Sequence, residues 1–304
     1  MSYGRFTLQR TAGLIAVVVV AVSGTWLLAH VLRPNRFPPT DRPLLPGLAD
    51  YLQRAFLHFD LGNSTGVGRR PVSELVLQGL PADLWLLAGA ILFGVAAGLA
   101  GGVVCAARPG SAAAKALQAA ALVFLCAPVY VVGMTLLLLL GSGIALSHVG
   151  IIPTHYVPLS QSPLRWFGSM LVPWIVLGLP LAALCLRMMR AETLEALKTD
   201  MLRTALAKGL RRRTALRRHA VPLAAAPAIS LAGASIPVVV TNLVLVERVF
   251  EVPGVLGRMQ GALATADFPV LFGLTFVVAA LVALATLLTD LVLGWLDPRV
   301  RGAT

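Results

Sequence analysis

The residues best placed to do chemistry lie in one short polar stretch, DMLRTALAKGL at 200–210, within a chain made mostly of Leu, Ala, Val and Gly. Asp200 can accept a hydrogen bond from a free backbone N–H and so act as a helix N-cap. Gly209 can adopt the left-handed conformation that ends many helices. The spacing predicts a helix over the eight residues Met201–Lys208, about 12 Å long. A short capped helix is suited to binding in a socket of another protein, although a solvated basic loop that serves only as a topology signal fits the spacing equally well.

Motifs for catalysis are missing from the rest of the chain. There is no GxxxxGK[ST] loop for ATP and no HExxH, and GASIP at 233–237 is not the GxSxG of a hydrolase. The five histidines are scattered, and only His30 falls within an apolar run. Cys105, Cys126 and Cys185 lie in apolar runs without CxxC or a histidine at ligand spacing, which favours buried apolar side chains over a metal site or a disulfide. We expect no enzyme activity, no metal and no cofactor in this chain.

The composition is typical of a protein whose solvent is lipid. Hydrophobic residues make up 58% of the 304 residues and charged residues only 12%, whereas soluble domains contain about 25% charged residues. The formal net charge of +12 could indicate nucleic-acid binding, but the basic residues lie between apolar runs, where membrane proteins place them for topology. We therefore predict a single transmembrane domain, residues 1–304, without a nucleic-acid partner.

Six apolar runs are long enough for membrane spans, which need about 20 residues. The first run could be mistaken for a secretory signal, but it is longer than a signal core and no convincing cleavage site follows it. The predicted spans are Thr11–Leu32, Ala82–Ala107, Ala116–Leu140, Gly168–Leu186, Pro222–Val246 and Val270–Leu293.

The basic residues predict the orientation of these spans. Sixteen Lys and Arg residues lie on the side that includes both termini and nine lie on the other side, which places both termini in the cytoplasm by the positive-inside rule. Three segments are then external, at about 33–81, 141–167 and 247–269. The only sizeable cytoplasmic loop covers about 187–221, and the polar stretch lies in its middle.

Features inside the spans bear on packing. Gly94, Gly98 and Gly102 form a tandem GxxxG, which predicts close approach of a neighbouring helix. Asp290 is a carboxylate near the inner end of the sixth span, where pairing with an arginine is favoured over a proton relay. Four prolines are expected to kink helices, with a gating hinge as the alternative: Pro128, Pro173, Pro180 and Pro237.

The polar stretch also resembles a known family. RTALAKGL at 203–210, followed by RHAVPLAAAP at 218–227, resembles the cytoplasmic EAA-type motif of ABC importer permeases, in the form found in the dipeptide/oligopeptide/nickel family. One departure is Leu206, which replaces the usual Arg. Further fragments agree in order and spacing over nearly the whole chain: YLQRAFLHFDLGNS (51–64), PVSELVLQGLPADLWL (71–86), CAPVYVVGMTLLLLL (126–140), LGLPLAALCLRMMRAETLEALKTD (177–200), ERVFEVPGVLGRM (247–259) and DPRVR (297–301).

The resemblance implies an all-α integral membrane protein with six transmembrane helices, both termini inside, large external loops and a short cytoplasmic coupling helix between helices four and five. That helix would seat in a separate ATPase chain, and ATP and Mg²⁺ would bind there rather than in this chain. The implied partners are a second homologous permease chain, two ABC ATPase chains and an extracytoplasmic substrate-binding protein, in a bacterial plasma membrane. The implied ATPase-coupling residues are Asp200, Arg203, Thr204, Ala205, Ala207, Lys208, Gly209 and Leu210.

The cargo implied by the resemblance is a di- or oligopeptide, with nickel, an opine or a glutathione-like compound as the alternative within the family. Two other classes remain open from the sequence. One is a membrane scaffold or sensor whose basic loop recruits a cytosolic partner without transport. The other is a secondary carrier, although such carriers usually need intramembrane acids and paired repeats of broken helices, and no inverted repeat is visible here.

Overall fold

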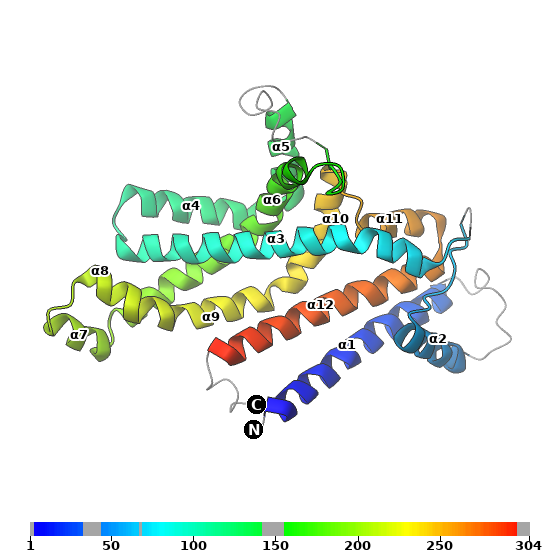
Figure 1. Ribbon diagram of the computed structural model, residues 1–304, viewed down its shortest axis with the longest axis horizontal. Coiled ribbons are helices and arrows are strands. Elements are labelled where there is room, and N and C mark those ends of the chain that lie inside the picture. Colours follow the sequence, from blue (N-terminus) through cyan, green and yellow to red (C-terminus); the bar gives the residue numbers. More distant parts are fainter. Residues whose placement is uncertain (1–2, 33–43, 67–68, 142–154, 297–304) are drawn as a thin grey trace. The chain divides into compact units, whose positions relative to one another are not determined.

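A computed structural model describes residues 3–32, 44–66, 69–141 and 155–296. Within these ranges the secondary structure is helical, apart from one isolated bridge between Asn63 and Pro71. The helices are α1 (Tyr3–Leu32), α2 (Leu44–His58), α3 (Val72–Ala107), α4 (Ala112–Cys126), α5 (Val129–Gly141), α6 (Pro163–Ala196), α7 (Asp200–Ala207), α8 (Arg212–Ala215), a π-helical turn (Leu216–Ala220), α9 (Val221–Ala234), α10 (Ile236–Val249), α11 (Leu256–Thr265) and α12 (Phe268–Leu296) (Figure 1). They form two compact units, the first from Met1–Leu84 and Pro253–Leu287, the second from Trp85–Val252 and Leu288–Thr304.

Within the described ranges, four helices are long and apolar enough to cross a membrane, and two further pairs qualify only if each bent pair counts as one span. The four are α1, α3, α6 and α12. The bent pairs replace the spans predicted at Ala116–Leu140 and Pro222–Val246: α4 meets α5 at 112°, and the α8–α9 run meets α10 at 52°. The prediction of an all-helical membrane protein is therefore confirmed, with four to six spans by length and composition.

Two of the four predicted proline kinks coincide with these bends. Pro128 lacks a backbone N–H and disfavours helical conformation in the residue before it; Ala127 is accordingly extended, with φ −73° and ψ 132°. Pro237 lies in the first turn of α10, where a missing N–H costs nothing. The other two, Pro173 and Pro180, lie inside α6, which continues through both as one helix.

Two helices extend beyond the apolar runs that predicted them, into segments that were predicted to be loops. Helix α3 begins at Val72 rather than at Ala82, and α6 continues to Ala196 rather than ending at Leu186. The extra turns carry polar residues, so hydropathy marked the apolar part of each helix and not its full length. The segment predicted as an external loop, 33–81, also contains α2, so it is partly helical.

A seam of glycines joins α3 to α6 in the second unit. A Cβ at Gly94 would lie 2.9 Å from the carbonyl O of Gly178, one at Gly98 would lie 2.4 Å from Cys185 Cβ, and one at Gly102 would lie 2.6 Å from Met189 Cβ. These distances leave no room for any side chain on that face of α3. The close packing predicted from the tandem GxxxG is confirmed.

Small and apolar residues continue this core on both sides of α6. Helix α4 packs against α6 through Ala114 and Ala121, which contact a cluster with Cys105, Ala183 and Leu186. Helix α9 packs on α6 through Ala224, Ala228 and Met189. The prediction of buried cysteines is confirmed for Cys105 and Cys185 and is wrong for Cys126, which is exposed near the end of α4; all three are free.

Tryptophans gather where α3 and α6 lie close to each other in the second unit. The ring centroids of Trp85 and Trp166 are 5.4 Å apart, and those of Trp166 and Trp174 are 5.9 Å apart. The indole N–H of Trp174 donates to the carbonyl O of Trp85 over 2.8 Å. Buried or half-buried tryptophans whose N–H groups are satisfied are typical of membrane–water interfaces.

The first unit has its own apolar core, built around α1, α2 and α12. Trp26 stacks near both Tyr51 and Phe272, with ring centroids 5.6 and 4.9 Å away. Burial raises the pKa of Tyr51 well above its usual range. Asp290 lies in the last turns of α12, and its side chain falls outside the part of the chain described, so its predicted pairing is not tested.

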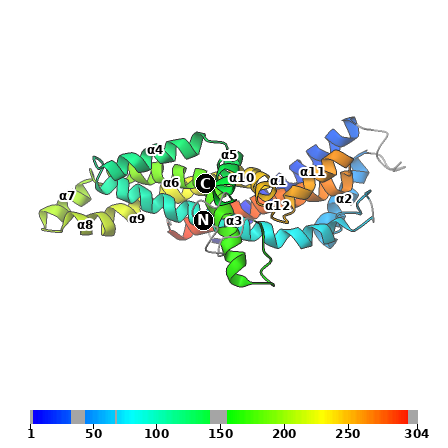
Figure 2. The same cartoon turned by 90° about the horizontal axis from the view of Figure 1, so that it is seen from above.

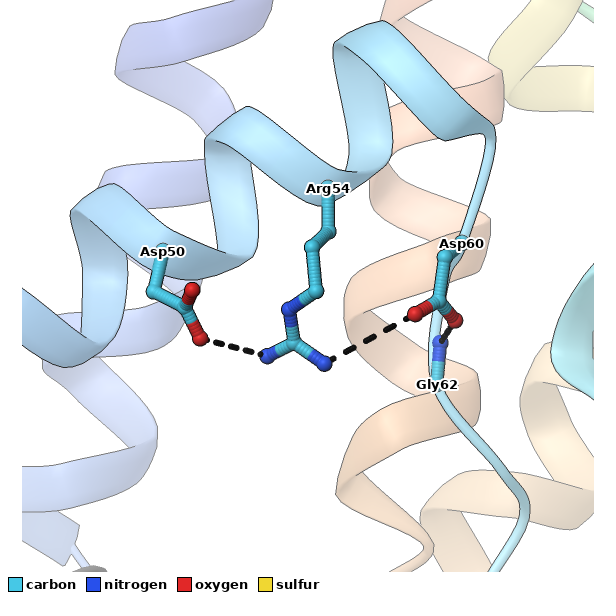
Figure 3. Close-up of polar contacts among 4 residues, drawn as sticks. All are labelled: Asp50, Arg54, Asp60 and Gly62. Atoms are coloured by element: carbon cyan, nitrogen blue, oxygen red, sulfur yellow. Dashed lines mark hydrogen bonds and ion pairs between the residues drawn. The ribbon is translucent and has the colours of Figure 1, made fainter.

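Helix α2 ends in a turn fixed by charged side chains (Figure 3). The Arg54 guanidinium lies 3.0 Å from an Asp50 oxygen and 3.7 Å from an Asp60 oxygen, and the other Asp60 oxygen accepts from Gly62 N–H over 3.0 Å. Phe59 and Gly62 both have positive φ, of 52° and 83°. The chain therefore turns sharply here and buries Leu61 in the core of this unit.

The loop that follows wraps around one carboxylate at the start of α12. Asp267 accepts hydrogen bonds from the hydroxyl of Ser64 and from the N–H groups of Thr65 and Gly66, the latter two at 3.1 and 3.2 Å. Burial raises the pKa of Asp267, but hydrogen bonds from Ser64, from Thr65 and from the backbone of Val270 outweigh it, and the pKa lies below its usual range.

A second carboxylate, Asp83, binds α3 to the segment before α11. It is 1% exposed and accepts from Val255 N–H over 2.8 Å. A Cβ at the neighbouring Gly79 would lie 2.9 Å from Gly254, so the two backbones touch. The sequence did not single out Asp83, because a buried carboxylate and a solvated one look alike in a single sequence.

Candidate functional site

The polar stretch forms a separate short helix, α7, at one end of the second unit. Figures 1 and 2 show α7 and α8 together beyond the adjoining ends of α6 and α9. Helix α7 covers Asp200–Ala207, which has the predicted length of eight residues but begins and ends one residue earlier than the predicted Met201–Lys208. Its N-cap is Thr199 rather than Asp200, which corrects the prediction by one residue. The hydroxyl of Thr199 donates to the carbonyl O of Ala196 over 2.7 Å instead of capping α7, so Asp200 supports the helix only as a first-turn acid near the positive end of its dipole.

The C-terminal end of α7 is a Schellman motif. Gly209 has φ +87°, its N–H donates to the carbonyl O of Leu206 over 3.0 Å, and Leu210 N–H donates to the carbonyl O of Ala205 over 3.2 Å. A Cβ on Gly209 would meet nothing within 4 Å. The glycine is therefore required by backbone conformation and not by space, as the sequence predicted.

One side chain fastens α7 to the helices on either side. Leu202 is 0% exposed and clusters with Ala196, at the end of α6, and with Ala220, in the π turn that leads into α9; Leu197 packs against them. The sequence did not single out Leu202. Leu202 and Leu206 are four residues apart and lie on the same side of the helix, whereas Met201 lies about 100° away, so the apolar spacing within eight residues does not indicate which of them is buried.

The remaining surface of α7 is open and chemically mixed. Of the predicted coupling residues, Ala205 and Leu210 are half-buried, and the other six are exposed: Asp200, Arg203, Thr204, Ala207, Lys208 and Gly209. Arg203 lies 3.7 Å from Asp200 in an exposed pair. Two apolar side chains that the sequence did not select, Met201 and Leu206, are 49% and 40% exposed on this short helix. The surface thus offers cations together with apolar contact area.

A single π turn follows α8 where the chain enters α9. Val221 N–H donates to the carbonyl O of Leu216, five residues back, and Pro222 then has no N–H to offer. Arginines line two open clefts here, of ≈ 380 and ≈ 420 Å³, the first formed by Arg213, Thr214, Arg217 and Arg218, the second also touched by Arg108 and Arg212. Single π turns are often found at functional sites.

The site has no arrangement for metal binding. No group of three or more His, Cys, Asp or Glu side chains close enough to hold a metal occurs in the described ranges. What α7 and the basic turn can do chemically is to bind another molecule by its acidic and apolar groups.

An apolar helical bundle that displays one short, anchored, basic helix defines the class: a multi-pass membrane protein whose exposed element is built for contact. The particular family follows from sequence comparison. Residues 98–302 match the family model described as "Binding-protein-dependent transport system inner membrane component". The chain belongs to this family and is an inner-membrane permease subunit of an ABC importer. Such subunits are not themselves catalytic.

Relatives of known name cover most of the chain. The dipeptide transport system permease protein DppB of Escherichia coli (strain K12) is 32% identical over 281 residues, covering 86% of this chain and 82% of that protein. A probable peptide ABC transporter permease protein, y4tP of Sinorhizobium fredii, is 29% identical over 262 residues, covering 84% and 82%.

One solved structure shares the fold. It is titled as a crystal structure of an amino acid ABC transporter with histidines, has a TM-score of 0.50 and 18% identity, and covers 75% of this chain and 94% of that one. At this identity the likeness supports the fold alone.

Proposed function

We propose that this chain forms half of the translocation pathway of a bacterial ABC importer and that α7 is its coupling helix, seated in a separate ATPase subunit. The observation that carries the proposal is the burial of Leu202 between Ala196 and Ala220. Because the Leu202 side chain contacts both the end of α6 and the π turn that leads into α9, a force applied to α7 reaches α6 and α9 together.

The surface of α7 supports an ATPase as the partner. Arg203 and Lys208 are exposed and suit acidic groups, while Met201 and Leu206 offer apolar area that is costly to leave in water. Leu206 stands where relatives of this type usually carry Arg, so the socket of the partner should be more apolar at that point. Ala205 and Ala207 are small enough to permit close approach.

Six spans with both termini in the cytoplasm complete the proposal. Each bent helix pair is then one broken crossing. Trp85 lies near the start of the apolar part of α3 and Trp166 lies in the first turn of α6, both on the side that would face outside, where aromatic belts occur. Arg108 and Arg187 follow the apolar parts of the same helices on the side that would face inside. The loop at about 187–221, with α7 in it, is then cytoplasmic.

Transport would follow from a two-state equilibrium. ATP binding would close the ATPase pair, draw the coupling helices of two permease chains together and favour the outward-facing state, because a ligand shifts a conformational equilibrium by its differential affinity for the two states. ATP and Mg²⁺ would bind only to the partner ATPases, and an external binding protein would deliver the cargo.

We propose di- or oligopeptides as the cargo, since relatives covering more than four-fifths of this chain carry that function in their names. Nickel, an opine or a glutathione-like compound is the alternative. These cargoes are separated by restoring the gene to a strain that lacks it and measuring uptake of labelled dipeptides and, in parallel, of ⁶³Ni²⁺. A scaffold or sensor would restore neither.

The coupling role is tested by two substitutions of Gly209, one by a residue that does not tolerate a positive φ and one by a residue that does. Valine at φ +87° is strained whatever the space around it, whereas asparagine adopts this region readily. We expect Gly209→Val to abolish uptake and to loosen copurification of the ATPase without reducing the amount of permease in the membrane. Gly209→Asn should leave both close to normal. Normal uptake with Gly209→Val would refute the coupling role.

The absence of an internal motor is tested separately. The purified chain, without partners, should neither bind nor hydrolyse ATP, and hydrolysis should appear only when the ATPase subunits are added. Hydrolysis by the pure chain that survives repurification would contradict the proposal.

A further inference from the structure

A groove between α4 and α6 lies apart from the coupling surface and has a different chemistry. Its volume is ≈ 390 Å³, and it is lined by Gln118 and Leu122 of α4 and by Arg187, Arg190 and Ala191 of α6. The two helices pack closely beneath it through the cluster of Ala114, Ala121, Ala183 and Leu186. The groove is therefore supported by a well-packed part of the second unit.

The positive end of the groove lacks a matching anion. Arg187 and Arg190 form no ion pair with any acid in the described ranges; Glu195, farther along α6, is paired with Lys198 at 2.7 Å. The Nε atom of Arg190 is buried and has no hydrogen-bond partner within the described part of the chain. A buried guanidinium N–H without an acceptor is costly, so this donor points to a ligand that the protein itself does not supply.

The other end of the groove is apolar and open. Leu122 is 55% exposed and Val123, beside it on α4, is 60% exposed. The amide N–H₂ of Gln118 donates back to the carbonyl O of Ala114 over 2.9 Å, which fixes this side chain on the wall between the two ends. The cationic groups of α6 and the aliphatic groups of α4 thus follow one another along the groove, with the aliphatic groups deeper in the apolar run.

We propose that this groove binds the phosphodiester headgroup of an anionic phospholipid, with Arg187 and Arg190 on the phosphate and an acyl chain along Leu122. Guanidinium groups bind phosphate oxygens by paired N–H donors, and basic pockets between transmembrane helices are known to hold anionic headgroups. The position of the arginines just beyond the apolar part of α6 matches headgroup depth. Assignment to the cytoplasmic leaflet rests on the orientation proposed above, but the lipid site itself does not depend on the ATPase role.

The test uses the full-length chain in detergent micelles, titrated with phosphatidylglycerol, with bound lipid counted by native mass spectrometry. The variant R187Q/R190Q removes the two arginines of the groove. Its matched control, R165Q/R211Q, removes two exposed arginines that line none of the three clefts described above. A basic side chain near a lipid surface contributes about a fivefold gain in binding, so we expect affinity about 25-fold weaker in R187Q/R190Q and unchanged in the control. Zwitterionic phosphatidylethanolamine should bind weakly to all three.

Other outcomes would overturn the proposal. Equal phosphatidylglycerol binding by the two double variants would exclude the groove. Displacement of the lipid by millimolar inorganic phosphate or glycerol phosphate would mean a site for free anions. Loss of a permease dimer in R187Q/R190Q, with lipid bound per chain unchanged, would mean that a second permease chain covers the groove. If R187Q/R190Q does not fold, Leu122→Trp keeps both guanidinium groups and fills the apolar end; unchanged lipid binding in that variant would also refute the site.

Discussion

Replacing Leu202 with alanine should detach α7 while leaving the membrane bundle folded. Leu202 is the one buried residue of the eight in α7. Leu→Ala in a core costs about 2–5 kcal/mol. The cluster around Leu202 consists of three buried residues with one further leucine packed on it, so the cost should fall at the lower end, about 2 kcal/mol. An isolated helix of this length is not stable in water, so the loss should appear as local opening of α7.

Hydrogen exchange of the α7 amides measures this opening directly. The N–H groups of Lys208, Gly209 and Leu210 are held by bonds to Thr204, Leu206 and Ala205. A loss of about 2 kcal/mol corresponds to an equilibrium shift of about 30-fold, because each 1.4 kcal/mol is a factor of ten. Exchange of a peptide that covers these amides should therefore accelerate by about 30-fold in Leu202→Ala. Peptides from the glycine seam of α3 and α6 should be unaffected.

Met201 supplies the matched control, one residue away on the same helix but 49% exposed. Met201→Ala should change exchange by no more than about twofold, since exposed substitutions usually stay within about 0.5 kcal/mol. If Met201 contacts the ATPase, its replacement should weaken copurification without opening α7. Equal exchange rates in Leu202→Ala and Met201→Ala would refute the reasoning, because burial would then not fasten α7 to its neighbours.

Three further predictions follow from packing and charge. Gly98→Val should lower the thermal unfolding temperature of the purified chain markedly, because its Cβ would lie 2.4 Å from Cys185 Cβ and 2.7 Å from the carbonyl O of Ala182. Gly13→Val, whose Cβ would have nothing within 4 Å, should leave the unfolding temperature unchanged. Because the pKa of Asp267 is depressed, its stabilisation should be complete above the ordinary Asp pKa of about 3.9 and be lost as pH falls through the lower folded value; Asp267→Asn should abolish this acid dependence of thermal unfolding. Arg54→Gln should cost less than about 1 kcal/mol in chemical denaturation, because both of its ion pairs are exposed.

The sequence predicted best those structural features that only one residue type can form. Gly209 predicted a left-handed helix end, and Gly94, Gly98 and Gly102 predicted a close helix contact, because in each case only a missing side chain satisfies the geometry. Hydropathy likewise found the apolar part of each span. The EAA-type resemblance and the family comparison agree on an importer permease.

What the sequence missed depends on contacts between distant segments. Asp83 and Asp267 are buried because backbone N–H groups from elsewhere in their unit converge on them, at Val255 and at Thr65 and Gly66, and nothing local to either aspartate indicates this. Leu202 is the buried residue of α7 because the break between α6 and α7 determines which face of the short helix is turned toward Ala196 and Ala220. Pro128 lies at the bend between α4 and α5, whereas α6 continues through its two prolines as one helix, which membrane helices tolerate where neighbouring groups satisfy the freed carbonyl.

The two connections of α7 differ in stiffness, and this bears on how motion would pass through it. On one side, α6 is held against α3 by glycine contacts that admit no side chain, so α6 should move only as a rigid rod. On the other side, the π turn at Leu216–Ala220 and Pro222 interrupt the regular hydrogen-bond ladder before α9. Because Leu202 contacts both sides, displacement of α7 should translate α6 together with α3, while the change in angle is absorbed at the π turn. If α7 is the coupling helix, the π turn before α9 should act as the hinge, and the glycine contacts should make α3 and α6 move as one body.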